Sequence, residues 1–206
     1  MTAADTTASD RYDPTTALVV VDVQNDFADP EGGLYVTGGE EVVPVVNREI
    51  AVAREAGAFI VYTQDWHPPE TPHFAKDGGD WPVHCVRDTW GAELHPDLEV
   101  VDDAPIVRKG VDGGDGYSGF SVRDPVSGEE SATELGRHLE QAGIRCVVVV
   151  GLAGDVCVKA TALDARELGY EVVLPEAATR MVELEPGDGE AALEALREAG
   201  VEVQPA

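Results

Sequence analysis

Short runs of β-branched residues alternate along this chain with longer segments whose apolar residues recur at helical spacing. The runs are ALVVVDV at 17–23, AFIVYT at 58–63, APIVRK at 104–109, CVVVVGL at 146–152, EVVLP at 171–175 and VEVQ at 201–204. Continuous apolar runs of this kind are typical of strands that are buried on both faces of a parallel sheet. The alternation predicts an α/β fold with three α/β/α layers around a mostly parallel sheet of about six strands.

Helices are predicted between these strands. They run from about Glu40 to Gly57, from Ser131 to Gly143, from Asp155 to Gly169 and from about Asp188 to Gly200. Each range ends at a glycine, which is the usual residue just beyond a helix C-terminus. Ser131 and Glu134 have the spacing of a capping box, which predicts where the second helix begins. Two long irregular regions remain, 65–100 and 110–130, and such loops in a compact domain are usually functional.

The chain has 206 residues, of which 43% are apolar, and this size predicts one domain over 1–206. Residues 1–14 are expected to form a flexible N-terminal segment. No run approaches the ~18 apolar residues of a membrane span, and the first residues lack the basic and apolar regions of a signal peptide. We therefore expect a cytoplasmic protein without a membrane partner.

Acidic residues dominate the charge: 40 Asp and Glu against 14 Lys and Arg give a net charge of −26. A field of that sign repels phosphate backbones and anionic lipids, so nucleic acid is excluded as a partner. Only three of the basic residues are lysines, namely Lys76, Lys109 and Lys159. The imbalance leads to the hypothesis of a salt-rich cytoplasm, where a Debye length of ~3 Å at 1 M screens the repulsion.

Cysteine usage points to thiol chemistry rather than to cross-links. Cys85, Cys146 and Cys157 form no C-x-x-C pair and no even framework, which argues against a disulfide scaffold and a four-cysteine zinc site. Cys157 follows the longest apolar strand after a short turn and lies near the start of the next helix. Unpaired amides and the helix dipole stabilise a thiolate there, so Cys157 is a candidate nucleophile, the alternative being a small core residue.

Charged residues also end two other predicted strands. Asp22 follows five apolar residues, and Lys109 closes the strand at 104–109. A buried carboxylate is costly unless it has a partner or a task. A carboxylate that takes the thiol proton and a lysine that favours anionic forms would complete a nucleophilic set with Cys157. The alternative is that Asp22 and Lys109 form a structural ion pair.

A second cluster combines imidazole and carboxylate groups in one loop region. Its members are Asp65, His67, His73 and His84. Ligands of these types suit one divalent ion, with zinc favoured and iron or manganese as alternatives. Surface histidines in a proline-rich loop are the competing interpretation. His95 and His138 lie in a loop and in mid-helix, where we expect structural or solvent-exposed side chains.

These residues lie within motifs that resemble those of nicotinamidases and pyrazinamidases, members of the isochorismatase-like cysteine hydrolase superfamily. The matching motifs are VVVDVQNDF with GGLYV after it, YTQDWHPPETPHF, WPVHCV, RKG before a loop ending in YSGF, and VVVGLAGDVCVKATALDA. They occur in family order from about Ala17 to Val203. The resemblance implies a Rossmann-like fold and a metal-dependent cysteine amidohydrolase, with nicotinamide as its small-molecule substrate. The number of subunits is left open, with a homo-oligomer as one alternative.

Roles are implied by the resemblance residue by residue. Asp22 corresponds to the general base, Lys109 to its charged partner and Cys157 to the nucleophile. The implied metal ligands are Asp65, His67 and His73, with His84 as the fourth ligand or a near neighbour. Phe27, Trp81 and Tyr117 match aromatic positions that line the substrate pocket. A cis Leu152–Ala153 bond is implied, as is an oxyanion hole made by the amides of Ala153 and Cys157.

One position departs from the pattern of the superfamily. Gly154 stands where threonine is common, so a hydroxyl contact is lost, and we expect glycine to supply an unusual backbone angle there. Two alternative functions remain at this point. The first is another amide hydrolase of the superfamily, such as a carbamoyl amide hydrolase, and the second is a metal-binding or redox-sensing domain without catalysis.

Overall fold

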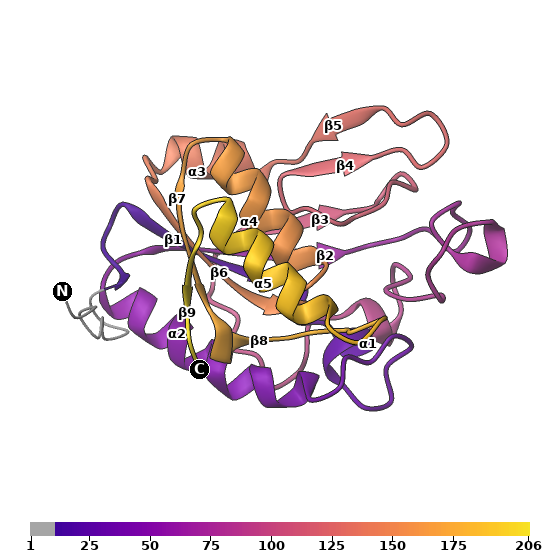
Figure 1. The fold of residues 1–206 in the computed structure, drawn as a ribbon, viewed down its shortest axis with the longest axis horizontal. Coiled ribbons are helices and arrows are strands. Elements are labelled where there is room, and N and C mark those ends of the chain that lie inside the picture. Colours follow the sequence, from indigo (N-terminus) through magenta and orange to yellow (C-terminus); the bar gives the residue numbers. More distant parts are fainter. Residues whose placement is uncertain (1–10) are drawn as a thin grey trace.

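A seven-stranded sheet with parallel pairings forms the centre of the protein (Figure 1). The computed structural model describes residues 11–206. Along the sheet the strand order is β3-β2-β1-β6-β7-β9, and β8 pairs with β6 off this path. The strands are β1 (Thr16–Val21), β2 (Phe59–Asp65), β3 (Ile106–Lys109), β6 (Cys146–Leu152), β7 (Glu171–Pro175), β8 (Thr179–Arg180) and β9 (Glu202–Gln204). All six predicted strands are present, and the fold class predicted from the sequence is confirmed.

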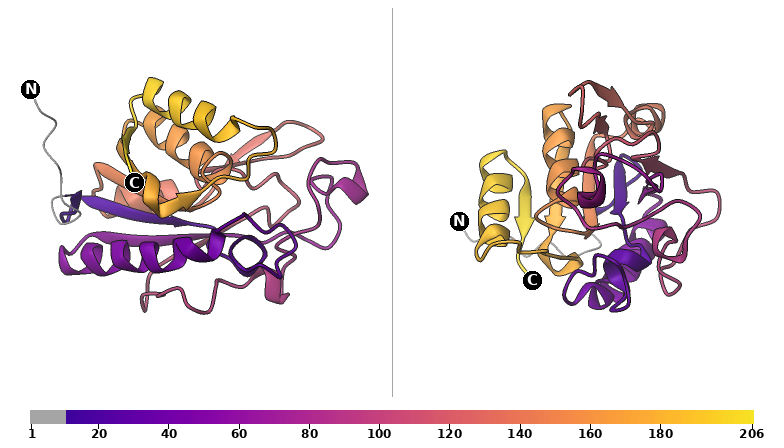
Figure 2. Two further views of the ribbon diagram at one scale, coloured as in Figure 1. Left: turned by 60° about the horizontal axis from the view of Figure 1, so that its bottom comes forward. Right: turned by 90° about the vertical axis from the view of Figure 1, so that its right-hand side faces the viewer.

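Helices cover both faces of this sheet and make three layers (Figure 2). One face carries α2 (Gly39–Glu55), and the other carries α3 (Leu135–Gln141), α4 (Cys157–Glu167) and α5 (Asp188–Glu198). The alternating side chains of β1 show why the strand is apolar throughout. Leu18 and Val20 belong to the buried cluster that includes α2, whereas Val19 and Val21 belong to the cluster that includes α4 and α5.

Smaller elements lie in the loops and were not predicted. They are α1 (Asn25–Ala28), the 3₁₀ helices η2 (Ala75–Asp77), η3 (Trp90–Ala92) and η4 (Glu176–Ala178), and the strands β4 (Ser121–Arg123) and β5 (Glu130–Ala132). Strands β4 and β5 pair antiparallel as a separate two-stranded sheet. None of the helices in residues 11–206 combines the length and apolar character that crossing a bilayer requires.

The predicted capping box at Ser131 is wrong. Ser131 lies within β5, where it pairs with Val122, and α3 begins at Leu135. The hydroxyl of Thr133 accepts a hydrogen bond from the Leu135 amide at 3.1 Å and donates one to the Gly119 carbonyl at 2.5 Å. Strand pairing with β4 therefore overrides the local helix signal, and the helix begins four residues later than predicted.

The N-terminal segment is described only from Arg11 onward, so residues 1–10 of the predicted flexible segment lie outside the described residues. Tyr12 is buried, and its hydroxyl donates a hydrogen bond to the Glu49 carboxylate at 2.7 Å. Arg11 forms an ion pair with the same carboxylate at 3.0 Å. Residues 11 and 12 are therefore packed against α2.

The order of the strands determines where a ligand can bind. From β1 the chain passes to β2 and β3 on one side, and later to β6, β7 and β9 on the other. Strands β1 and β6 are thus neighbours at the point where the order reverses. In open parallel sheets, ligands bind beyond the carboxyl ends of the strands at such a point. The loops after β1, β2, β3 and β6 all lie at this edge.

Candidate active site

Four polar side chains from four separate stretches of chain meet at this edge. Asp22 directly follows β1, Asp65 ends β2, Lys109 ends β3 and Cys157 begins α4 after β6. All four are buried, with between 0% and 8% of their surface exposed. Because β2 and β3 are parallel and in register, Asp65 lies directly beside Lys109. The structure thus brings together the acid, amine and thiol that the sequence analysis singled out.

Lys109 is the centre of this group. Its ammonium nitrogen lies 2.7 Å from Asp22 Oδ2, 2.5 Å from Asp65 Oδ1 and 3.9 Å from Cys157 Sγ, and it donates a hydrogen bond to the carbonyl of Gly116. Burial alone would lower the pKa of Lys109, but the carboxylates of Asp22 and Asp65 raise it well above its usual value. The lysine is therefore charged, and it balances part of the buried negative charge.

Asp22 is held with one oxygen toward the lysine. The hydroxyl of Thr63 donates to Asp22 Oδ1 at 2.6 Å, and Oδ2 faces Lys109. One carboxylate oxygen each from Asp22 and Asp65 and the sulfur of Cys157 all lie within 4.8 Å of one another. Burial raises the pKa of Asp22 to about 6, although the charge of Lys109 opposes that shift. A pKa near neutrality suits a group that must both accept and return a proton.

Cys157 needs such a base. Burial raises the pKa of its thiol well above the usual value, and the nearby charge of Lys109 only partly offsets this. The resting sulfur therefore holds its proton. Since Cys157 is the first residue of α4 and its sulfur lies 3.9 Å from the Lys109 ammonium, the helix dipole and the lysine both stabilise the thiolate once the proton has left.

The turn between β6 and α4 presents two free amide groups. The Leu152–Ala153 peptide bond is cis, as the family resemblance implies. Val156, which precedes the helix, has φ −122° and ψ −95° and is not helical. Within residues 11–206, the amides of Ala153 and Cys157 donate to no backbone carbonyl or side chain. Both residues line the same pocket, so these donors are available to a bound molecule.

Three imidazole rings form a second cluster next to the buried charges. One ring nitrogen each from His67, His73 and His84 lies within 4.8 Å of the others. Nδ1 of His84 lies 2.7 Å from the Pro82 carbonyl, which fixes that ring and leaves Nε2 for another partner. Asp65 Oδ2 lies 3.8 Å from Nε2 of His67, so its carboxylate adjoins both the lysine and the imidazoles.

The environment of His67 indicates whether these residues suit a metal ion. Its side chain is fully buried, and both ring nitrogens lack a hydrogen-bond partner in the part of the chain that the structure describes. An unpaired buried polar atom costs on the order of 1–3 kcal/mol, which coordination of an ion would remove. Three imidazoles beside a carboxylate are also a donor set that zinc accepts. The residues therefore fit a divalent metal ion.

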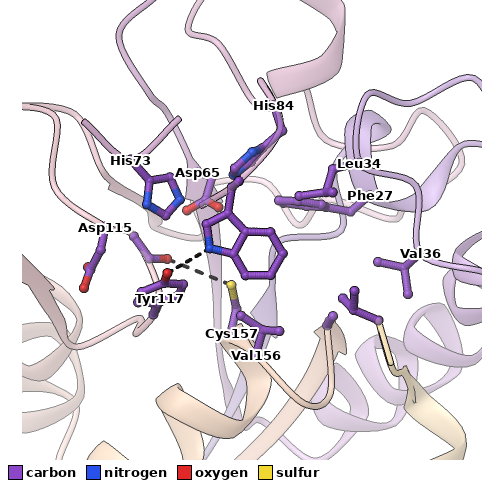
Figure 3. Close-up of a pocket in the computed structure, with 14 residues that line it drawn as sticks. Phe27, Leu34, Val36, Asp65, His73, His84, Asp115, Tyr117, Val156 and Cys157 are labelled. Atoms are coloured by element: carbon purple, nitrogen blue, oxygen red, sulfur yellow. Dashed lines mark hydrogen bonds between the residues drawn. The ribbon is translucent and has the colours of Figure 1, made fainter. Parts of the chain in front are cut away.

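A small pocket separates the thiol from the imidazoles. Figure 3 shows Cys157 on one side of it and the rings of His73 and His84 on the other. The three aromatic residues assigned to the pocket all line it: Phe27, Trp81 and Tyr117. The indole Nε1 of Trp81 donates a hydrogen bond to the Tyr117 hydroxyl at 2.8 Å, which joins the two long loops across the pocket.

Comparison with models of known protein families identifies the family of this chain. The model described as "Isochorismatase domain" matches residues 16–206. The chain belongs to the isochorismatase family. A nicotinamidase of Escherichia coli (strain K12) is 36% identical over 203 residues, which cover 91% of this chain and 93% of that protein.

Two solved structures of this family superpose on the chain. A pyrazinamidase of Pyrococcus horikoshii in complex with zinc has a TM-score of 0.83 and 39% sequence identity, and the match covers 94% of this chain and all of that one. PnC1 from L. infantum, in complex with nicotinate, has a TM-score of 0.84 and 38% identity over 93% of both chains.

Several residues that support the site were not predicted. Gln24, which lies between β1 and α1, accepts a hydrogen bond from the Asp65 amide and donates one to the Asp65 carbonyl, each at 2.8 Å, and so fixes Asp65 at the end of β2. Thr63 holds Asp22, and the Gly116 carbonyl accepts from Lys109. Thr63 has a sequence signal, because it is a polar side chain within the predicted buried run AFIVYT, whereas Gln24 and Gly116 lie outside the predicted runs.

The remaining histidines lie outside the imidazole cluster. His95 is buried, and its Nδ1 accepts a hydrogen bond from the Asp97 amide at 3.2 Å, which is a structural contact. His138 lies on α3, with about a quarter of its side chain exposed (25%), near Glu134. Both placements agree with the structural or exposed roles expected from the sequence.

Close packing accounts for Gly154. Its φ is not in the left-handed region that favours glycine. A Cβ atom at this position would lie 2.4 Å from Sδ of Met181 and 2.9 Å from Oγ1 of Thr179. The thioether of Met181 therefore occupies the space that a larger residue at 154 would need.

Proposed function

We propose that this isochorismatase-family protein is a metal-dependent cysteine amidohydrolase that converts nicotinamide to nicotinate and ammonia, and that it also accepts pyrazinamide. The observation that carries the proposal is the placement of a thiol with its acid and lysine on one side of a small pocket and of a three-imidazole cluster on the other, with His73 and His84 lining the pocket. Relatives named nicotinamidase and pyrazinamidase support the choice of substrate.

The proposed cofactor is one divalent metal ion, with zinc as first choice and iron or manganese as alternatives. Its ligands would be His67, His73 and His84, with the carboxylate of Asp65 beside them. The zinc complex of the P. horikoshii relative supports this choice. When bound there, the ion would supply a ligand position for the pyridine nitrogen and so orient the ring.

Orientation of the ring places the carboxamide carbon at the sulfur. The pocket between the imidazoles and Cys157 is lined by aromatic side chains that pack against a flat ring, with Phe27 and Tyr117 among them. Holding the two reacting atoms in attack geometry is worth ~7 kcal/mol or more. Binding and alignment are thus the same event in this pocket.

The chemistry then follows from the buried charges. Asp22 accepts the proton of the Cys157 thiol, and the thiolate attacks the amide carbon to give a tetrahedral oxyanion. The amides of Ala153 and Cys157 donate to this oxygen, each worth about 3–4 kcal/mol by comparison with other oxyanion holes. Asp22 returns the proton to the departing ammonia. A water molecule, activated by Asp22, hydrolyses the remaining thioester to nicotinate and regenerates the thiol.

The imidazole cluster also distinguishes this proposal from the alternatives. A carbamoyl amide hydrolase would use the cysteine without metal-binding histidines, whereas here three of them converge within 4.8 Å. A metal-binding or redox-sensing domain would not need Asp22 and Lys109 beside its sulfur. Alkylating Cys157 separates enzyme from sensor, because only an enzyme loses ammonia release from nicotinamide.

Replacing His67 with alanine is expected to remove the metal ion and to weaken nicotinamide binding. His67 is the fully buried member of the cluster, and its ring nitrogens have no other partner among the described residues. Metal content by atomic emission and KM for nicotinamide measure the two effects. His138→Ala is the matched control and should keep wild-type metal content. A His67→Ala protein with the full metal complement would show that the ligand assignment is wrong.

We propose that the protein works in a cytoplasm rich in salt. Its proposed substrate is a neutral small molecule, and its proposed assembly is a homo-oligomer. The net charge of −26 repels the chain from itself at low ionic strength. We expect the thermal midpoint to rise between low and molar KCl because the salt screens this repulsion. Differential scanning calorimetry over that range checks it, and a midpoint that stays constant would contradict the hypothesis.

A further inference from the structure

The turn between β6 and α4 is tied to a segment that contributes nothing to the catalytic group itself, residues 179–183. Leu152 pairs with Arg180 in the sheet, and the Gly154 amide donates to the Arg180 carbonyl at 2.8 Å. Figure 1 shows β8, which begins this segment, running beside the end of β6. The backbone of the turn is therefore hydrogen-bonded to the backbone of this segment.

Asp155 adds a side-chain connection to the same segment. Its Oδ1 accepts a hydrogen bond from the Val182 amide and its Oδ2 accepts one from the Glu183 amide, both at 2.9 Å. Bonds from backbone amides to an ionised carboxylate are stronger than those between neutral groups. Glu183 has φ +54°, in the left-handed region, which is costly for a non-glycine residue and persists where surrounding bonds fix it.

The position of Asp155 in the turn gives these bonds a consequence for catalysis. It lies two residues after Ala153 and two before Cys157, the residues with the free amides. Inside the turn, the Ala153 carbonyl accepts from the amides of Val156 and Val158 at 3.1 and 3.0 Å. The turn is thus fixed from within by Ala153 and from outside by Asp155.

Asp155 acts only through other residues. Its side chain does not line the pocket, whereas Ala153, Val156, Cys157 and Val182 do. We propose that Asp155 is a positioning residue that holds the amides of Ala153 and Cys157 where the developing oxyanion needs them, with residues 179–183 as its anchor. The inference rests on the proposed amidohydrolase function.

Asp155→Asn tests this, because asparagine keeps the size of the side chain but loses the charge and one of the two acceptors. We expect kcat for nicotinamide to fall roughly 10- to 100-fold, less than the ~10²–10³-fold loss from removing an oxyanion donor outright. KM should stay within about twofold of wild type, since an interaction made only in the transition state lowers kcat and kcat/KM together. A rise in KM with unchanged kcat would overturn the proposal.

Inhibition by pyridine-3-carbaldehyde distinguishes a role in positioning the two amides from a role in the stability of the fold alone. The thiol of Cys157 adds across its carbonyl: the S–C bond forms, the C=O π bond breaks and the thiol proton ends on the oxygen, which faces the two amides. Asp155→Asn should weaken inhibition by this aldehyde in proportion to kcat. Alkylation of Cys157 by iodoacetamide forms no oxyanion and should keep its wild-type rate. Equal losses of aldehyde binding and alkylation rate would overturn the proposal.

Asp188→Asn is the matched control. The Asp188 carboxylate accepts a hydrogen bond from the Glu185 amide at 2.9 Å, in the loop before α5, so the variant loses a similar bond away from the turn. It should behave as wild type in all three assays. If Asp155→Asn does not fold, Asp155→Glu, which keeps the charge but lengthens the side chain, should show the same pattern.

The two proposals fail in different ways. A wild-type protein that releases no ammonia from nicotinamide would contradict the proposed function. A wild-type protein that releases ammonia normally, beside an Asp155→Asn variant with unchanged kcat and unchanged aldehyde inhibition, would overturn only the positioning role.

Discussion

Cys157→Ala is expected to lower kcat for ammonia release from nicotinamide by a factor on the order of 10⁵ or more, the size of loss seen when a catalytic nucleophile is removed. Without the sulfur there is no covalent intermediate, and Asp22 has no thiol proton to accept and return to the leaving group. Metal content should stay at the wild-type level because the imidazole cluster lies across the pocket from residue 157. A coupled ammonia assay and metal analysis measure both effects.

Cys146→Ala is the matched control for this variant. Cys146 begins β6 at the opposite end of the strand from the turn, and its side chain is partly buried. Its replacement should leave kcat unchanged within about twofold. Turnover retained in Cys157→Ala would show that the nucleophile assignment is wrong, whatever the control does.

Lys109→Met is expected to destabilise the fold and to abolish turnover. Methionine fills a similar volume but leaves the carboxylates of Asp22 and Asp65 buried without the ammonium that lies 2.7 and 2.5 Å from them. Removing one partner of a buried ion pair costs about 3–5 kcal/mol, because the remaining charge is uncompensated. Urea unfolding at pH 8, followed by circular dichroism, measures the loss in free energy of unfolding.

The pH dependence of this loss has a definite sign. The pKa of Asp22 is already raised to about 6 by burial, and Lys109 opposes that rise, so removing the lysine moves it further upward. A folded-state pKa above the unfolded value favours folding as pH falls, since the folded protein binds the extra proton. The deficit of Lys109→Met should therefore be smaller at pH 5 than at pH 8.

Lys76→Met is the control for this prediction. Lys76 is exposed and pairs with Asp77 at 2.6 Å, and an exposed pair contributes at most about 1 kcal/mol. A Lys109→Met protein no less stable than Lys76→Met would contradict the role of Lys109 as the counter-charge. A loss in free energy of unfolding that grows from pH 8 to pH 5 would contradict the inference that removing Lys109 raises the pKa of Asp22.

The sequence predicts the main sheet well for a physical reason. The runs 17–21 and 146–152 are buried on both faces and are therefore apolar throughout, which makes their ends easy to locate. In a parallel sheet those ends meet at one edge, so Asp22, Lys109 and Cys157 could be placed together before their distances were known. The hairpin β4–β5 could not be predicted, because its strands are short and largely polar.

The supporting contacts of the site are less predictable. Gln24 and Thr63 are recognisable only once β1 and β2 are aligned, since their partners lie 41 residues away in each case. Asp155 is within the motif GLAGDVC, yet its partners Val182 and Glu183 follow a strand of two residues that has no sequence signal. Such contacts depend on tertiary pairing rather than on local pattern.

Ammonia release from nicotinamide by the purified wild-type chain tests the central claim most directly. With zinc present, we predict that ammonia and nicotinate appear in equal amounts, and that either a chelator or alkylation of Cys157 stops both. Ammonia release that neither treatment alters, or no release at all from the metal-loaded protein, would contradict the account.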